Sequence, residues 1–128
     1  MAFFCSFRGL IGILCSTTIH QQNENTMKTE KDLQKYLRKE ALRHGMTFDK
    51  VESRSRKGFP DCLLVLGGFV AFIELKSPAG TGVLSASQER VITDLRNHSA
   101  RVWVVDSKAQ ADTAIQDIEF LAEMMERG

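Results

Sequence analysis

Two acidic residues and one lysine are predicted to meet at one end of a short β-hairpin. The Gly67-Gly68 dipeptide separates two apolar runs and is a strong signal for a two-residue hairpin turn. Such a turn places Asp61 opposite Glu74, and it places Lys76 on the same face because side chains alternate along a strand. Directly opposed like charges destabilise a sheet. We therefore expect a hard divalent cation between the two carboxylates.

Length and composition fit one globular domain. The chain has 128 residues, of which 43% are hydrophobic and 26% are charged, as is usual for a soluble protein. A net charge of +1 excludes a globally basic nucleic-acid binder, so any nucleic-acid contact must use a local patch. Basic residues outnumber acidic ones from Lys28 to Asp61, and acidic residues dominate after Asp106. Two solvated helix faces would explain this asymmetry equally well.

The N-terminal region and the cysteines indicate how the domain is bounded and in which compartment the protein is expected. Residues 1–26 look foreign to the rest, and their apolar stretch is too short to span a bilayer. We expect residues 1–26 to be an extension that is disordered or lies upstream of the true start at Met27, and residues 27–128 to form the domain. The three cysteines form neither a metal-ligand spacing nor a disulfide framework, which favours a reducing, cytoplasmic setting away from membranes. The three cysteines are Cys5, Cys15 and Cys62.

Helix and strand signals after residue 27 follow the order αβββαβα. Capping boxes predict helices that begin near Thr29 and Ser85, and a third helix begins near Ser107. The passage from strand to helix to strand after Glu74 implies a parallel crossover, hence a mixed central sheet flanked by helices. The strand Phe69–Leu75 is apolar on both faces away from Glu74, which predicts a central strand covered on both sides. The other strands are expected at 46–53, 61–66 and 101–105.

The sequence combines this order with a set of motifs: Glu30 in the first helix, Gly58-Phe59-Pro60-Asp61, Glu74-Leu75-Lys76-Ser77-Pro78 and Leu84-Ser85-x-x-Gln88. Together, the order and the motifs resemble the PD-(D/E)XK nuclease superfamily and, within it, the VRR-NUC family. The resemblance covers roughly residues 27–106. It implies a restriction-endonuclease-like αβββαβα core and hydrolysis of phosphodiester bonds. Phe59 departs from the family, which more often has a small or aliphatic residue there.

Metal binding and water activation are the roles expected of the hairpin residues. Asp61 and Glu74 would bind Mg²⁺ or Mn²⁺ through carboxylate oxygens, and the resemblance adds the backbone carbonyl of Leu75 as a ligand. Lys76 would orient or help deprotonate the attacking water and offset charge on the scissile phosphate. The structural alternatives are two solvated acids and a salt bridge from Lys76 to either acid, and the salt bridge is compatible with catalysis.

Three further groups have two interpretations each. Glu30 shares a stripe with Leu33 and Leu37, so we expect it to face inward as a metal ligand or base, although a first-turn acid also suits the helix dipole. Gln88 occupies position N3 of a capping box, and by resemblance it is also an active-site residue. The loop before Pro60 either contacts DNA phosphates or is merely solvated. Its basic residues are Arg54, Arg56 and Lys57.

We predict a Mg²⁺- or Mn²⁺-dependent DNA endonuclease, and the resemblance extends this to branched or junction DNA cut by a homodimer. The alternative is a catalytically idle nucleic-acid-binding or assembly module with the same fold. No zinc-ligand spacing, P-loop or nucleophile elbow occurs, which excludes those chemistries. The last helix carries the candidate dimer interface, unless its apolar stripe only covers its own sheet. That stripe includes Ile115, Ile118, Leu121 and Met125.

Overall fold

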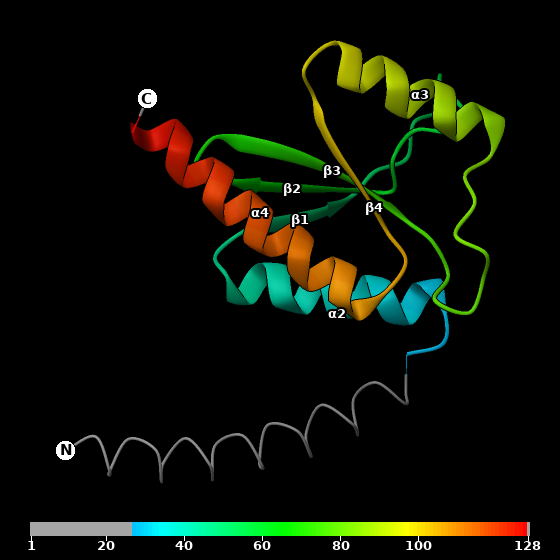
Figure 1. The fold of residues 1–128 in the computed structure, drawn as a ribbon, viewed down its shortest axis with the longest axis horizontal. Helices are drawn as coiled ribbons and strands as arrows, with labels where there is room; N and C mark the ends of the chain where they lie inside the picture. Colours follow the sequence, from blue (N-terminus) through cyan, green and yellow to red (C-terminus); the bar gives the residue numbers. More distant parts are fainter. Residues whose placement is uncertain (1–26, 128) are drawn as a thin grey trace, which may run out of the picture.

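The computed structural model describes residues 27–127 and has the predicted order αβββαβα (Figure 1). The predicted extension 1–26, with Cys5 and Cys15, lies outside the described residues. No helix within residues 27–127 combines the length and the apolar character needed to cross a membrane. The elements are α2 (Glu30–Arg43), β1 (Thr47–Lys50), β2 (Cys62–Leu66), β3 (Phe69–Leu75), α3 (Ala86–Asn97), β4 (Arg101–Val105) and α4 (Lys108–Arg127).

The four strands form one mixed sheet in the order β1-β2-β3-β4. β1 and β2 pair antiparallel, as do β2 and β3, while β3 and β4 pair parallel. The parallel pair confirms the predicted crossover through α3. Since the C-terminal ends of parallel strands meet at one edge of a sheet, the crossover brings the end of β4 beside the end of β3.

Local sequence signals set the start of α2 where it was predicted, and a glycine follows its end. The Asp32 backbone N–H donates to Thr29 Oγ1 at 3.1 Å, and the Thr29 N–H donates to the Asp32 carboxylate at 3.2 Å. This reciprocal pair is the predicted capping box. The helix ends at Arg43 with His44 as its C-cap, and Gly45 follows with a φ of +79°, a conformation that favours glycine.

The β2–β3 hairpin has the predicted register, with Cys62 opposite Ile73 at its open end. Gly67 and Gly68 have φ values of +56° and +82°, as a twist-matched two-residue turn requires. β2 begins at Cys62, so Asp61 stands one residue before the ladder rather than inside it.

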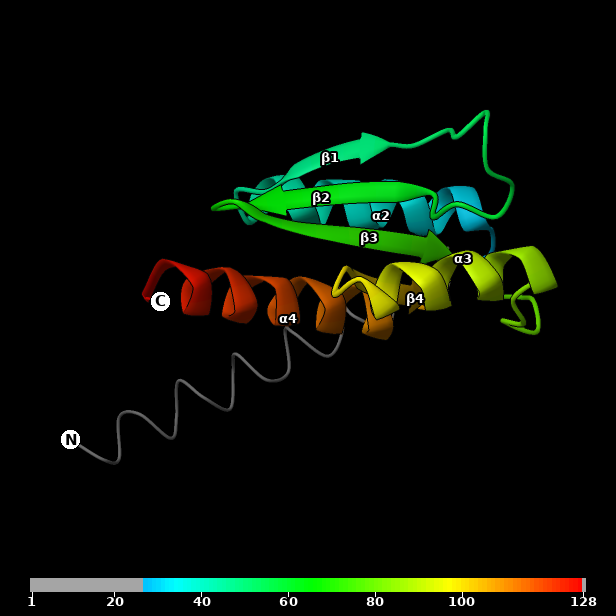
Figure 2. The ribbon, with the colours of Figure 1, turned by 90° about the horizontal axis from the view of Figure 1, so that it is seen from above.

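The two faces of the sheet are covered unequally. α2 and α4 pack side by side on one face and bury the main core there (Figure 1). α3 lies over the end toward which β3 points (Figure 2). Glu74 near that end is 1% exposed, whereas Val70 at the start of β3 is 42% exposed. The prediction that both faces of β3 are covered is therefore wrong for its first half, because α3 covers only the other end.

The apolar stripe of α4 serves the domain itself. Ile115 and Ile118 are buried in the core formed with α2 and the sheet, and Leu121 packs partly buried against it. Ile115 and Ile118 are therefore unavailable for the predicted dimer interface. The large apolar side chains that α4 exposes are Phe120, Met124 and Met125.

Candidate active site

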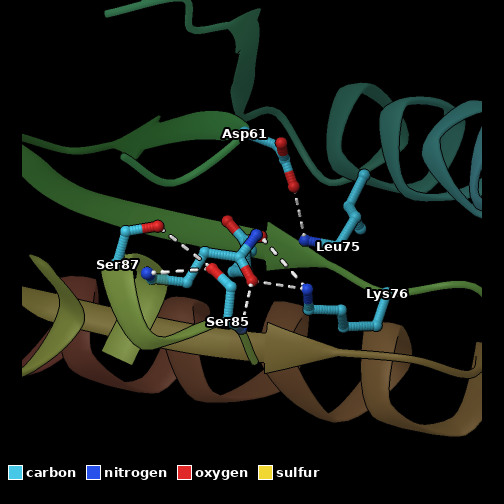
Figure 3. A network of polar contacts seen from close by, with 7 residues as sticks. Asp61, Leu75, Lys76, Ser85 and Ser87 are labelled. Atoms are coloured by element: carbon cyan, nitrogen blue, oxygen red, sulfur yellow. Dashed lines mark hydrogen bonds and ion pairs between the residues drawn. The ribbon is translucent and has the colours of Figure 1, made fainter. Parts of the chain in front are cut away.

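The site lies at the open end of the β2–β3 hairpin, next to the start of α3 (Figure 3). The Asp61 carboxylate accepts a hydrogen bond from the Leu75 backbone N–H at 2.9 Å, which extends the hairpin contact one residue beyond the ladder. The Asp61 carbonyl accepts from the Val51 N–H at 2.8 Å on the β1 side. Asp61 is thus held between two strands, with its side chain turned toward β3.

Glu74 is the only charged residue that is buried within residues 27–127. Its Oε1 accepts a hydrogen bond from Gln88 Nε2 at 2.5 Å and lies 3.9 Å from Lys76 Nζ. Its Oε2 is buried without any hydrogen-bond partner among the described residues. Burial, followed by the negative charge of Asp61, raises the pKa of Glu74 to about 8. The folded chain alone therefore disfavours the ionised form of this carboxylate.

Gln88 joins α3 to Glu74 near the end of β3 and to Lys76 just after it. Its Oε1 accepts from Lys76 Nζ at 2.6 Å and from the Ser85 backbone N–H at 2.9 Å. Its backbone N–H donates to Ser85 Oγ at 3.2 Å, which completes the capping box (Figure 3). One amide therefore caps the helix and also contacts Lys76 and Glu74. The two interpretations of Gln88 are geometrically compatible.

Gly58 lets the basic loop approach the start of α3 closely. A Cβ added at this position would lie 2.6 Å from the carbonyl carbon and oxygen of Ser87 and 2.8 Å from the Gln88 backbone nitrogen. Gly58 also has a φ of +91°, which side chains rarely tolerate. Its lack of a side chain thus helps fix where α3 begins relative to the hairpin.

The three predicted DNA-contacting residues of the loop differ in their surroundings. Arg56 Nη2 lies 2.6 Å from Asp94 Oδ2, so its charge is engaged by α3. Arg54 and Lys57 are exposed and form no ion pair within residues 27–127. Only these two are free to meet a phosphate without first giving up an ion pair. Phe59, the departure from the family pattern, packs edge-on against Phe72 with ring centroids 5.6 Å apart.

Glu30 is exposed, so the prediction that it faces inward is wrong. α2 packs on the face of the sheet opposite to the Glu74 side chain, and Glu30 is its first residue. Partial burial and the charge of Asp61 raise the pKa of Glu30. The charges of Lys76 and Lys50 act in the opposite direction. Glu30 is thus an electrostatic neighbour of the site.

The carboxylates of the site do not form a three-residue metal cage. No group of three or more His, Cys, Asp or Glu side chains within residues 27–127 is arranged to hold a metal ion. Glu30 is not grouped with Asp61 and Glu74 in this arrangement, and its role as a metal ligand stays a prediction. Mg²⁺, however, is usually bound through one or two carboxylates and keeps several waters. Asp61 and the unpaired oxygen of Glu74 fit that requirement, and the carbonyl of Leu75 remains a predicted third ligand.

Two residues near the site were missed in the sequence. Lys50 pairs with Cys62 across β1 and β2, next to Asp61, and its charge acts on Glu30. The short strand β1 lacks an alternating pattern, so its register gave no signal. Asp94 was missed because its ion pair with the basic loop joins segments far apart in the sequence.

Comparison with protein families and structures gives a consistent result. The family model for the VRR-NUC domain matches residues 13–109, which begins within the predicted extension. A solved structure of a VRR_NUC domain is similar, with a TM-score of 0.62 and 30% sequence identity. The similarity covers 68% of this chain and 94% of that chain. A search of curated proteins gives no match.

Proposed function

The chain belongs to the VRR-NUC family of nuclease-type domains, and we propose that it is a metal-dependent endonuclease that hydrolyses phosphodiester bonds in DNA. The observation that carries the proposal is the unpaired Oε2 of Glu74. A buried carboxylate oxygen without a donor is destabilising, and Asp61 adds a second negative charge beside it. A divalent cation bound at this point would compensate both.

The expected metal is Mg²⁺ or Mn²⁺, held by Asp61 and Glu74. When bound, it would supply positive charge that activates water and stabilises the leaving oxygen. The side chain of Lys76 is anchored by Gln88 Oε1, and an ammonium group has three N–H donors. Lys76 therefore keeps donors for the attacking water or for an oxygen of the scissile phosphate. Gln88 also holds Glu74, so Lys76 and Glu74 stay in a fixed relation.

Local positive charge supports a nucleic-acid substrate. Lys50, Arg54 and Lys57 lie near the site or in the loop that leads to it, although the whole chain is almost neutral. Such side chains contact phosphates and position a duplex without reading its sequence. We extend the proposal to branched or junction DNA, because two copies related by a two-fold axis would present two active sites to two strands.

A cleavage panel tests the proposal. The full chain is incubated with linear, flapped, nicked and four-way DNA in the presence of Mn²⁺ or Mg²⁺. Cleavage of at least one substrate that is lost in chelator and in Lys76→Ala supports the proposal. Arg38→Ala is the matched control, because Arg38 is exposed on α2 and belongs to no part of the site.

The alternative is an idle nucleic-acid-binding or assembly module. Calorimetric titration with Mg²⁺ and Mn²⁺ distinguishes it from the nuclease. Absence of cleavage together with absence of metal binding would favour the idle module. Metal binding that disappears in Asp61→Ala supports the proposed ligand.

A further inference from the structure

A second concave surface lies at the outer edge of β4, near the end of α3 that is farther from Gln88. Its volume is about 680 Å³, within the range of about 300–1,000 Å³ that is typical of ligand sites. The last turn of α3, the start of β4 and one side of α4 line it. We call it the β4-edge pocket. The side chains that give it chemical character are Arg96, Arg101, Trp103, Asp117 and Phe120.

Two aromatic rings line the β4-edge pocket. Trp103 packs edge-on against Phe69, with ring centroids 6.4 Å apart, and its Nε1 donates to Asp117 Oδ2 at 3.2 Å. These two contacts fix the orientation of the indole. Phe120 is 63% exposed, so its ring has apolar surface still open to a ligand. A fixed and an exposed aromatic ring together offer surfaces on which nucleobases stack.

The charges of the pocket favour an anion. Arg96 donates through Nη2 to the Val102 carbonyl at 2.8 Å, and a guanidinium has five N–H donors, so most of them remain. Arg101 is exposed and has no ion-pair partner within residues 27–127. Asp117 is the only acid of the lining, and it is engaged by Trp103. The remaining positive charge and planar donors suit a phosphate group.

We propose that the β4-edge pocket binds an unpaired nucleotide of a nucleic-acid strand, with its base against Trp103 and Phe120 and its phosphates at Arg96 and Arg101. The inference rests on the proposed nuclease function at one point, because it takes the bound strand to be part of the nuclease substrate. It implies that the enzyme prefers DNA with a single-stranded arm or an unstacked junction.

The pocket and the proposed cleavage site lie on opposite faces of the sheet, on either side of its outer strand β4. Trp103 contacts Asp117 of α4 on one face, and Glu74 contacts Gln88 of α3 on the other. Arg101 pairs with Ala71 on β3, and Val104 pairs with Glu74. Three residues along a strand span about 10 Å, so the two sites are offset by a short length of β4, and a nucleic-acid strand bound at both would pass around this edge of the sheet. An added peptide strand is the competing occupant, because β4 is the last strand of the sheet built from residues 27–127. The arginines favour the nucleic acid.

Trp103 reports on the pocket directly, because it is the only tryptophan of the chain. An unlabelled octathymidylate is titrated into the full chain in chelator, so that no cleavage occurs, and indole fluorescence is recorded. We expect saturable quenching, and weaker quenching by a duplex of the same length, whose bases are already stacked. No quenching by the octathymidylate, or equal quenching by the duplex, overturns the proposal.

Variants test the stacking contact of the base and the arginine contacts of the phosphates separately. Phe120→Ala should weaken binding at least about fivefold, the lower end of what one base–aromatic stack contributes. Arg101→Ala should weaken binding. It should also reduce the slope of log Kd against log salt concentration by about 0.7. Asp117→Asn should tighten binding, because it removes a negative charge, and Arg38→Ala should change nothing. Wild-type affinity in both Phe120→Ala and Arg101→Ala would refute the pocket, as would preferential quenching by an extended peptide.

The Asp61→Ala variant separates this inference from the proposed function. Asp61 lies outside the β4-edge pocket, so its loss should leave the quenching unchanged while it removes cleavage. Quenching by a chain that cleaves no DNA supports the pocket and contradicts the nuclease. Cleavage without quenching contradicts the pocket alone.

Discussion

Gln88 Nε2 lies 2.5 Å from Glu74 Oε1, so the residue that completes the cap of α3 also contacts the buried acid of the site. The amide oxygen of Gln88 meets Lys76 as well. The start of a helix and the arrangement of two charged side chains therefore depend on a single amide. We therefore expect Gln88 to matter for cleavage as well as for the cap of α3.

Comparison of Gln88→Ala with Ser85→Ala separates capping from site geometry. Both variants damage the capping box, and loss of an N-cap residue costs about 0.5–2 kcal/mol. Ser85→Ala keeps the Ser85 backbone N–H and every contact of the Gln88 amide. We expect both to lose stability in denaturant unfolding but only Gln88→Ala to lose most of its cleavage rate. Equal losses of rate would mean that Gln88 acts through the cap alone.

Glu74 should make the metal-free protein less stable at high pH. Its pKa is raised in the folded state, so its stabilising contribution is complete below the unfolded value near 4.5 and is lost as pH rises through the folded value of about 8. Glu74→Gln keeps an acceptor for Gln88 Nε2 and removes the charge. In chelator, we expect the unfolding free energy of Glu74→Gln to exceed that of the wild type more at pH 9 than at pH 5.

Added Mg²⁺ provides the control for this effect. It should raise the stability of the wild type at pH 9 and leave Glu74→Gln nearly unchanged. The same pH dependence in both proteins would show that another group is responsible.

Much of the site's framework follows from local sequence. Gly67 and Gly68 define a two-residue turn, and the side-chain period of two then predicts the strand partners up to Cys62 and Ile73. Capping residues such as Thr29 fix where helices begin. These features could be predicted because each depends on residues a few positions apart.

The remaining features depend on how helices sit on the sheet. Glu30 has the helical phase of a buried residue, yet it is exposed, because it is the first residue of α2 and α2 covers the sheet face opposite to Glu74. The pairing of Arg56 with Asp94 requires the exact placement of α3. Trp103 and Phe120 come together only when β4 and α4 pack. Sequence periodicity contains none of these distances.

Asp61→Asn should abolish cleavage while it preserves the hairpin. The asparagine carbonyl can still accept the Leu75 N–H, which Asp61 holds at 2.9 Å, but it lacks the negative charge proposed to bind the cation. We expect a loss of at least about 100-fold in rate, typical for removal of an important electrostatic contact. Circular dichroism and thermal melting should stay close to the wild type. A rate within a few-fold of the wild type would contradict the assigned role.

A dimer is expected in solution, with an interface that excludes Ile115 and Ile118. Met124 and Met125 near the end of α4 are its exposed large apolar side chains outside the β4-edge pocket, and they are the candidates for this interface. Light scattering at micromolar concentration should return twice the chain mass of 14.4 kDa. A Met124→Glu, Met125→Glu variant should shift the mass toward the monomer. A monomer mass for the wild type, with and without DNA, contradicts the expectation.

Gly58→Ala should disturb the site indirectly, although Gly58 is not one of its charged residues. The new Cβ would lie 2.6 Å from the backbone of Ser87, and the φ of +91° adds backbone strain of about 1–3 kcal/mol. We expect lower stability and a larger fall in cleavage rate, because relief of the clash moves Gln88 relative to Glu74. Gly68→Ala is the matched control, with a φ of +82° and no atom within 4 Å of its added Cβ. Gly68→Ala has similar backbone strain without the clash, so it should lose stability but retain cleavage. Equal losses of cleavage rate in the two variants would assign the effect to backbone strain alone.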